Sequence, residues 1–118
     1  RMDAFNGASL GARINAGGGE PVFEEPPFLP HGIKGIFVTG NARVGKNCKI
    51  YQQVTIGIGN SSNEAPVIGD NVVIGAGAKI IGKIKVGNNV KIGANCIVCE
   101  DIPDNATVVM HKPRIIIK

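Results

Sequence analysis

The residues of this sequence best suited to acid–base chemistry are its two histidines, His31 in "LPHGIKGI" and His111 in "HKPRIIIK". An imidazole titrates near neutral pH, so His31 can take a proton from an attacking alcohol and return it to a leaving group. A covalent route is not expected, because no Cys or Ser stands in a nucleophile motif. On residue type alone, a histidine between Pro and Gly is more often a surface loop residue. His111 has no supporting motif, and we expect it to be solvated.

The cysteines offer a second chemistry, since Cys96 and Cys99 form a C-x-x-C pair. This spacing occurs in metal and redox sites, but a single pair lacks the other two ligands of a structural zinc site. A repeat of six residues explains the spacing without a site. We therefore expect Cys48 and Cys96 to be small core residues, Cys99 to replace a corner glycine, and no metal to be bound. An odd number of cysteines also fits a reducing compartment.

A repeat of six residues must position these groups. Apolar residues recur every six positions, and a second small or apolar residue follows four positions after each. The first set is Val38, Val44, Ile50, Ile56, Ile68, Ile74, Ile80, Val86, Ile92 and Val98, and the second is Ala42, Cys48, Val54, Val72, Ala78, Ile84, Val90, Cys96 and Ile102. An α-helix would spread this pattern around its surface, whereas short strands joined by regular corners keep it on one side.

Glycine and asparagine mark the corners of the repeat. Glycine directly follows the first apolar residue at Gly45, Gly57, Gly69, Gly75, Gly87 and Gly93, and the third position after it is Asn41, Asn47, Asn71, Gly77, Asn89 or Asn95. Both residue types tolerate positive φ at low cost. Each hexad is therefore one short strand plus one turn. Three hexads can close a triangular coil, which is stable only when several coils stack.

With three hexads per coil, residues 18 apart should stack. The predicted columns are Val38/Ile56/Ile74/Ile92, Val44/Ile80/Val98 and Ile50/Ile68/Val86. One hexad, residues 62–67, breaks the pattern because Ser62 stands at an apolar position, although Ile56 and Ile68 remain in phase. We interpret residues 58–66 as a loop that leaves the prism at one face and returns.

Composition and charge exclude several classes of protein. The 118 residues have room for one domain, and the absence of Trp suits a prism of small aliphatic side chains. No apolar run approaches the roughly 20 residues needed to cross a bilayer, and no secretory signal is present. We therefore expect a cytoplasmic protein without membrane insertion. The net charge is +4, and five of the cations fall on the last hexad position, where we expect one to point outward at each corner: Arg43, Lys49, Lys79, Lys85 and Lys91. No aromatic residues are interleaved with them, which favours a solvated surface over nucleic-acid binding.

The chain divides into three predicted parts. Residues 1–37 fit the repeat poorly and read as a loop-rich segment leading into the prism. Residues 38–109 carry the repeat, and residues 110–118 form a basic tail that can meet an anionic ligand at low cost.

Several segments together resemble the hexapeptide-repeat acyltransferases, and within them the serine acetyltransferase-like branch, which includes sugar and capsule O-acetyltransferases. The segments are "PHGIKGIFV", "CKIYQQVTIG", "PVIGDNVVIGAGAKIIGKIKVGNNVKIGANCIV" and the closing "IPDNATVV" with "KPRIIIK". The resemblance covers roughly residues 29–118. It implies an all-β fold, a left-handed parallel β-helix with an irregular N-terminal segment and one loop excursion at about residues 58–66.

The resemblance also implies an acetyl-CoA-dependent O-acetyltransferase that assembles as a homotrimer. Acetyl-CoA, the co-substrate, would lie in a groove between adjacent subunits, with a small hydroxyl acceptor nearby. His31 matches the family's catalytic base, which takes the proton of the acceptor hydroxyl. Gly57 matches a small residue near the thioester, where a backbone N–H can stabilise the developing oxyanion. The remaining matches to cofactor positions are Ala76 and Ala94 along the pantetheine arm and Lys112 and Arg114 near the nucleotide.

The sequence departs from the serine acetyltransferases at position 65. They carry a second active-site histidine just before the Pro that re-enters the prism, and this chain has Ala65 there. The departure favours a sugar or polysaccharide-precursor hydroxyl as acceptor, with L-serine as the alternative. The residues that could orient the base histidine are Asn15, Glu20, Glu24 and Glu25.

Two other classes stay open. A catalytically inactive β-helix scaffold is the stronger rival, because a lost histidine can signal lost activity. A γ-type carbonic anhydrase shares the β-helix, but it needs three zinc histidines and this chain has two in all.

Overall fold

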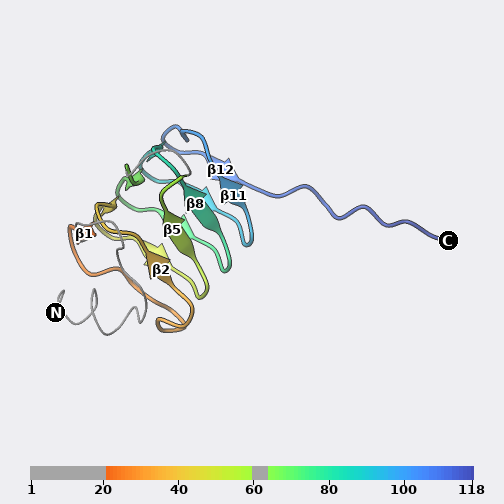
Figure 1. Ribbon diagram of the computed structural model, residues 1–118, viewed down its shortest axis with the longest axis horizontal. Helices are drawn as coiled ribbons and strands as arrows, with labels where there is room; N and C mark the ends of the chain where they lie inside the picture. The colour runs from red at the N-terminus through yellow and green to blue at the C-terminus, as the bar shows by residue number, and fades with distance from the viewer. Residues whose placement is uncertain (1–20, 60–63) are drawn as a thin grey trace.

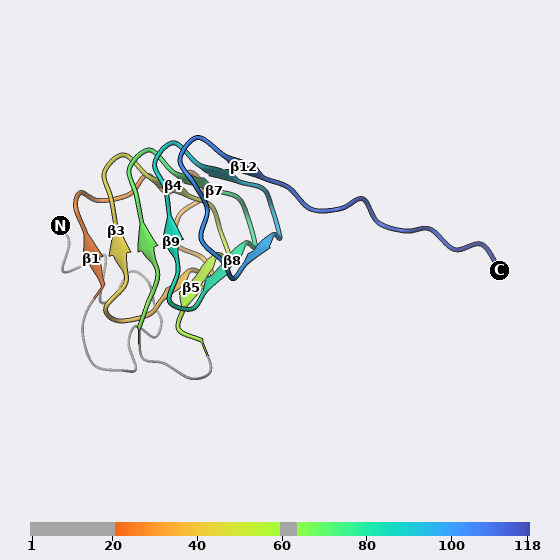
Figure 2. The ribbon, with the colours of Figure 1, turned by 90° about the horizontal axis from the view of Figure 1, so that it is seen from above.

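The computed structural model describes residues 21–59 and 64–118. These residues form an all-β, left-handed parallel β-helix, seen from two directions in Figure 1 and Figure 2. Its strands are β1 (Val22–Phe23), β2 (Phe37–Val38), β3 (Arg43–Val44), β4 (Lys49–Ile50), β5 (Thr55–Gly57), β6 (Val67–Ile68), β7 (Val73–Ile74), β8 (Lys79–Ile81), β9 (Lys85–Val86), β10 (Lys91–Ile92), β11 (Ile97–Val98) and β12 (Thr107–Val108). Within the described ranges no helix is long and apolar enough to cross a membrane.

Three parallel sheets form the faces of a triangular prism. Face 1 has the strand order β1-β3-β6-β9, face 2 is β4-β7-β10-β12, and face 3 is β2-β5-β8-β11. Consecutive strands of the chain therefore lie on different faces, and each strand pairs with one from the next coil, about 4.8 Å away. In Figure 2 the strands of face 1 stand in front and run upward while the coil advances to the right, which makes it left-handed.

The register of the sheets corrects the predicted columns. Val38 pairs with Ile56 as expected, but Ile56 pairs with Ile80, an offset of 24 residues instead of 18. The observed columns are Val38/Ile56/Ile80/Val98, Phe23/Val44/Ile68/Val86 and Ile50/Ile74/Ile92/Val108.

The cause is the segment between β5 and β6. The chain leaves face 3 after Gly57 and rejoins at Val67 on face 1, and the described residues between them supply no strand. Residues 60–63 of the predicted loop lie outside the described ranges. Between β5 and β6 the chain therefore passes from one face to the next. The step from Ile56 to Ile68 is twelve residues instead of six, so the apolar positions stay in phase while every later hexad lies one face away from its predicted place.

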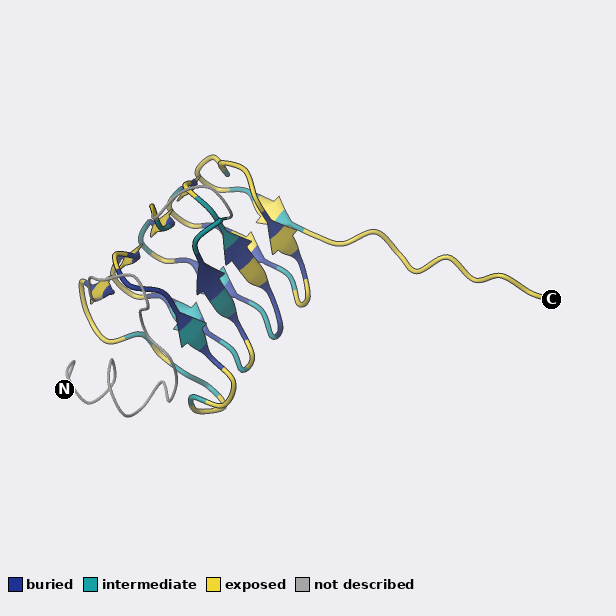
Figure 3. Ribbon diagram, in the orientation of Figure 1, coloured by how far each residue is buried: buried dark blue, intermediate teal, exposed yellow. Residues whose placement is uncertain are grey.

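The interior is a stack of small aliphatic side chains, as the repeat predicts. Every residue of the two inward sets is buried except Ile102, which is half-buried. Figure 3 shows these buried residues along the strands of every coil. Cys48 and Cys96 belong to this core, so the prediction for these two is confirmed, and Cys99 is exposed. The predicted outward cations also point away from the core, but they stand on strands and not at corners.

The backbone confirms one of the two predicted sets of corner residues. All six residues at the third position, Asn41, Asn47, Asn71, Gly77, Asn89 and Asn95, have positive φ, between 57° and 74°. The glycines that directly follow the first apolar residue do not have positive φ. Gln53 and Asn105 adopt the same conformation at equivalent positions that the repeat did not single out. Each of these hexads therefore contains one residue with positive φ, and the chain turns the corner at that residue.

The two ends of the chain differ from the central coils. Sheet pairing begins inside the predicted loop-rich segment, because β1 pairs with β3 and Phe28 bridges to Lys49. After β12 the chain is exposed and extends away from the prism (Figure 1). The division of the chain after residues 37 and 109 stays a prediction.

Candidate active site

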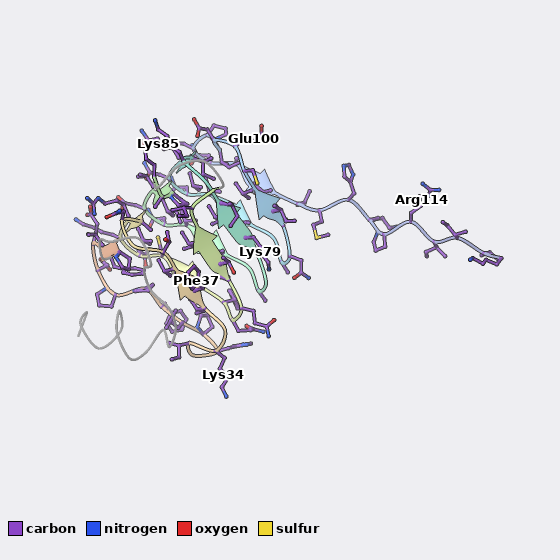
Figure 4. The ribbon with its side chains drawn as sticks, viewed as in Figure 1. Lys34, Phe37, Lys79, Lys85, Glu100 and Arg114 are labelled. Carbon is purple, nitrogen blue, oxygen red and sulfur yellow. The ribbon has the colours of Figure 1, made fainter. Side chains whose placement is uncertain are left out.

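His31 lies in a loop that replaces one corner of the prism. Phe28 bridges to Lys49 on face 2, and Phe37 pairs with Thr55 on face 3. Nine residue steps therefore cross a corner that takes six steps one coil later. Because of the three additional residues, residues 29–36 project from the prism as a loop. Lys34 lies in this loop, at the lower tip of the molecule in Figure 4.

The loop is fixed to the coil above it. The N–H of Gln53 donates to the carbonyl of Lys34 at 2.9 Å. Gly35, with φ of 69°, packs so closely that a Cβ would lie 2.8 Å from Cγ of Gln53. Leu29 and Ile33 pack against the core from inside the loop. The histidine is thus carried by a segment with defined contacts on both sides.

The imidazole of His31 is exposed and meets one aromatic ring. It contacts Tyr51 edge-on, with the ring centroids 5.7 Å apart and an interplanar angle of 74°. Within residues 21–59 and 64–118, no residue makes a hydrogen bond or ion pair to this imidazole. The contact with Tyr51 is therefore the interaction that the described residues supply to the ring.

The predicted orienters do not meet His31 in the part of the chain that the structure describes. Glu24 and Glu25 are exposed and make no hydrogen bond to it. Asn15 and Glu20 lie outside the described residues.

The edge between faces 1 and 2 carries a ladder of polar side chains, and we call it the polar edge. Lys46, Asp70, Asn88 and Asp104 lie above one another there. The N–H of Lys46 donates to Oδ1 of Asp70 at 2.8 Å, and the N–H of Asp70 to Oδ1 of Asn88 at 2.7 Å. The N–H of Asn88 continues the ladder to Oδ1 of Asp104 at 2.8 Å. On this edge, side chains satisfy the backbone donors that the corners leave free.

Gln52, Ala76 and Ala94 take the same hexad position on the edge between faces 2 and 3, which we call the small-residue edge. Their stacking follows from two bonds: the N–H of Gly77 donates to the carbonyl of Gln52 at 3.0 Å, and that of Asn95 to the carbonyl of Ala76 at 2.8 Å. An alanine methyl cannot accept a hydrogen bond. No described residue accepts one from the N–H of Gln52, Ala76 or Ala94. This edge therefore presents a ladder of backbone donors, one per coil.

The loop of His31 forms the lowest corner of the small-residue edge, and Tyr51 directly precedes Gln52 on it. The structure thus places His31, Ala76 and Ala94 along one edge. Oε1 of Gln52 is buried without a hydrogen-bond partner among the described residues.

Gly57 lies on the edge between faces 3 and 1, which we call the loop edge because the chain leaves the prism there after β5. Its carbonyl accepts a hydrogen bond from the N–H of Gly82 at 2.8 Å. Its pairing with Ile81 directs its own N–H toward β8 as well. The whole of face 3 separates Gly57 from the edge of His31, so one chain does not bring the two residues together.

Lys112 and Arg114 lie in the extended tail, where both are exposed. Figure 4 shows Arg114 far out along the tail, away from the prism. The structure therefore does not bring either cation to the edge that carries His31, Ala76 and Ala94.

Comparison with known proteins places this architecture in a family. Residues 65–100 match the bacterial transferase hexapeptide (six repeats) family. The chain is 45% identical over 110 residues to a serine acetyltransferase of Staphylococcus aureus (strain Mu50), covering 92% of this chain and 45% of the relative. It also resembles the crystal structure of serine acetyltransferase isoform 3 of Entamoeba histolytica in complex with cysteine, with a TM-score of 0.74 and 40% identity over 83% of this chain and 36% of that one.

The described coils are thus similar to those of the serine acetyltransferases and carry the hexapeptide repeat. The serine acetyltransferase of Neisseria gonorrhoeae in complex with serine is likewise similar, at 38% identity and a TM-score of 0.71, over 79% of this chain and 39% of that chain. The chain spans less than half the length of these relatives.

Position 65, where the resemblance implies a second histidine, is occupied by Ala65. This residue is half-buried and packs against the core, directly before the buried Pro66. A methyl group therefore stands just before the chain rejoins the prism at β6.

Two features of the site were not foreseen. One is the ladder of free N–H groups, which needs the stacking of the coils to be visible. The other is Tyr51, for which the sequence does carry a signal. It stands at the hexad position that is glycine in six other hexads, and a bulky residue there breaks the repeat.

Proposed function

We propose that this protein transfers the acetyl group of acetyl-CoA to a hydroxyl of a small acceptor, with His31 as the general base. The proposal rests on the small-residue edge. Each coil above the loop of His31 contributes one backbone N–H to this edge, and no described residue accepts a hydrogen bond from it. The equivalent donors on the polar edge are capped by side chains. The small-residue edge thus has backbone N–H groups available to a ligand, whereas those of the polar edge are already hydrogen-bonded.

The small-residue edge fits an extended acyl carrier. The pantetheine arm of CoA is a narrow chain with amide carbonyls, which accept hydrogen bonds from backbone N–H groups. Ala76 is half-buried and Ala94 exposed, so neither side chain blocks an approach to the edge. On this proposal the N–H groups of Ala76 and Ala94 hold the arm, and its thioester end points down toward His31.

His31 supplies the proton chemistry. As the acceptor oxygen attacks the acetyl carbonyl carbon, the imidazole takes the hydroxyl proton, and a tetrahedral oxyanion forms. When the C–S bond breaks, the imidazolium returns the proton to the departing sulfur of CoA, so the histidine ends the cycle neutral. Such a positioned base typically contributes about 10²- to 10⁴-fold in rate.

The site is complete only when a second copy of the chain contributes. His31 and Gly57 lie on different edges, separated by face 3. If one copy sets its small-residue edge against the loop edge of a neighbour, Gly57 of the neighbour meets the thioester end of the arm. Repeating this contact around a three-fold axis gives a homotrimer, which we propose as the active assembly. The tail cations Lys112 and Arg114 would then fold back to the nucleotide end of CoA.

The comparisons favour L-serine as the acceptor over the sugar that Ala65 suggests. The relatives are named serine acetyltransferases, and two similar structures were determined with serine or cysteine. Ala65 removes one of the two histidines of that pattern and leaves His31 alone. We therefore propose serine as the acceptor to be tested first, in a protein that acts in the cytoplasm.

Release of free CoA thiol from acetyl-CoA, measured with L-serine and with a panel of sugars, tests the proposal. We expect thiol release that depends on L-serine. Release with a sugar but not with serine would keep the acetyl transfer and change the acceptor. No release with any acceptor, despite measurable CoA binding, would support the inactive scaffold instead.

A further inference from the structure

Tyr51 stands where the fold favours glycine. The equivalent position is glycine in six other hexads and is taken by Thr39, Ile81 and Cys99 on face 3. On faces 1 and 2 the next coil passes directly above this position. A Cβ added at Gly75 would lie 2.7 Å from the backbone nitrogen of Ala94, and one at Gly69 would lie 2.9 Å from the carbonyl oxygen of Gly87. Such contacts require the structure to shift. A tyrosine at this position is thus a departure that calls for a reason.

The ring of Tyr51 provides a fixed platform for His31. Its backbone N–H donates to the carbonyl of Ile74 at 3.0 Å, which anchors the residue to the coil above. Its side chain is half-buried, whereas His31 is exposed on the projecting loop. The edge-on geometry, with a centroid distance of 5.7 Å and an angle of 74°, is one that aromatic pairs prefer.

An unheld imidazole on a surface loop would sample several rotamers, and only some of them would direct a nitrogen at an acceptor. The described residues supply no carboxylate or other polar partner to select one rotamer. The aromatic contact with Tyr51 does select among these rotamers, because an edge-to-face pair forms in a narrow range of ring orientations.

We propose that Tyr51 is a positioning residue for His31: its ring, and not its hydroxyl, holds the imidazole in the orientation that faces the small-residue edge. This proposal rests on the proposed function for its catalytic consequence. The ring contact itself can be tested without any reaction.

The composition of the chain allows a direct spectroscopic test. Tyr51 is the single tyrosine and there is no tryptophan, so intrinsic emission reports on this residue alone. An imidazole in contact with the tyrosine ring alters the intensity and lifetime of its emission. We expect the emission of His31→Gln to differ from that of the original protein. The emission of His111→Gln, the matched control in the tail, should be unchanged. Identical emission from His31→Gln and the original protein would overturn the proposal.

The kinetic test separates the ring from the hydroxyl. Tyr51→Phe keeps the ring, and we expect its kcat to stay within about twofold of the original. Tyr51→Leu removes the ring and should lower kcat by about 2- to 13-fold, the factor that corresponds to the usual energy of an aromatic pair. KM for acetyl-CoA should not change, because the ring acts on the base. Phe28→Leu is the control, since its exposed ring lies over Nζ of Lys49 and not against His31.

The outcomes distinguish this proposal from the proposed function. Equal loss of kcat in Tyr51→Phe and Tyr51→Leu would assign the effect to the hydroxyl and overturn the proposal, as would an unchanged kcat in Tyr51→Leu. If the original protein transfers no acetyl group, the proposed function fails, and the ring-current shift of the His31 protons in NMR decides the positioning. Loss of that shift in Tyr51→Leu with retention in Tyr51→Phe supports it, and no change in either variant refutes it.

Discussion

The contrast between the polar and small-residue edges can be tested by converting one into the other. On the polar edge, the side chain of Asn88 accepts a hydrogen bond from the N–H of Asp70 at 2.7 Å. Ala94 takes the equivalent position above the N–H of Ala76, which has no acceptor among the described residues. Ala94→Asn should therefore cap that N–H, and the exposed position has room for the amide.

Two effects of opposite sign are expected from Ala94→Asn. The new hydrogen bond should stabilise the fold by about 0.5–1.5 kcal/mol, less a part for the lost side-chain entropy. At roughly 2–8 °C per kcal/mol, the thermal midpoint should rise by a few degrees. CoA loses the same N–H as a donor, so its Kd should increase about 2- to 13-fold. Calorimetric titration with CoA and thermal unfolding monitored by circular dichroism measure the two effects.

Asn88→Ala is the matched control for this experiment. It uncaps the N–H of Asp70 on the polar edge, so stability should fall by a similar amount while CoA affinity stays the same. A raised midpoint with unchanged CoA affinity in Ala94→Asn would show that CoA does not use the small-residue edge. An unchanged midpoint would show that the N–H of Ala76 does not point to position 94, and the reasoning from the polar edge would be wrong.

Four further predictions concern the base, the tail, the thiols and the assembly. His31→Ala should lower turnover by about 10²- to 10⁴-fold while CoA binding stays nearly intact, and the melting temperature should move by no more than a few degrees because the side chain is exposed; full activity would assign the proton to another group. Reversing both charges in Lys112→Glu with Arg114→Glu should weaken CoA binding and reduce its dependence on salt, since such contacts are screened over roughly 10 Å at 0.1 M salt; unchanged affinity would remove the tail from the site. Burial raises the pKa of the Cys48 thiol, so a thiol reagent near neutral pH should modify the exposed Cys99 quickly and Cys48 only after unfolding; rapid modification of Cys48 would contradict the buried placement. Light scattering should give three times the mass of one chain at micromolar concentration, and a monomer would rule out the proposed shared site.

The period of six predicted most of the fold. Its two apolar positions identified the core, and its Asn and Gly positions identified the corners, because both depend on local backbone preference and on which side of a short strand faces inward. The period did not single out His31, which was predicted as a base from the resemblance of its motif to the hexapeptide-repeat acyltransferases. The placement of Cys48 and Cys96 in the core followed from the same count.

The assignment of hexads to faces depended on tertiary structure. A loop of one full period keeps the apolar phase and shifts every later strand to another face, so the sequence pattern is the same whether residues 62–67 occupy a face or a corner. The pairings of Val44 with Ile68, Ile50 with Ile74 and Ile56 with Ile80, each 24 residues apart, distinguish the two arrangements. That pairing sets which residues stack, and hence which backbone N–H groups meet a side-chain acceptor in the next coil.

The arrangement of the candidate site also depended on tertiary structure. Ala76 and Ala94 can be read from the repeat, but their free N–H groups depend on what lies one coil above, and sequence distance does not reveal it. The ring contact between His31 and Tyr51 joins residues 20 positions apart on adjacent coils. The sequence by itself determined the strands of the central coils and the corners, and it predicted His31 as a candidate base, because these depend on short segments of the chain. The tertiary structure decided which edge keeps free backbone donors and which ring contacts His31, because both arise from contacts between coils.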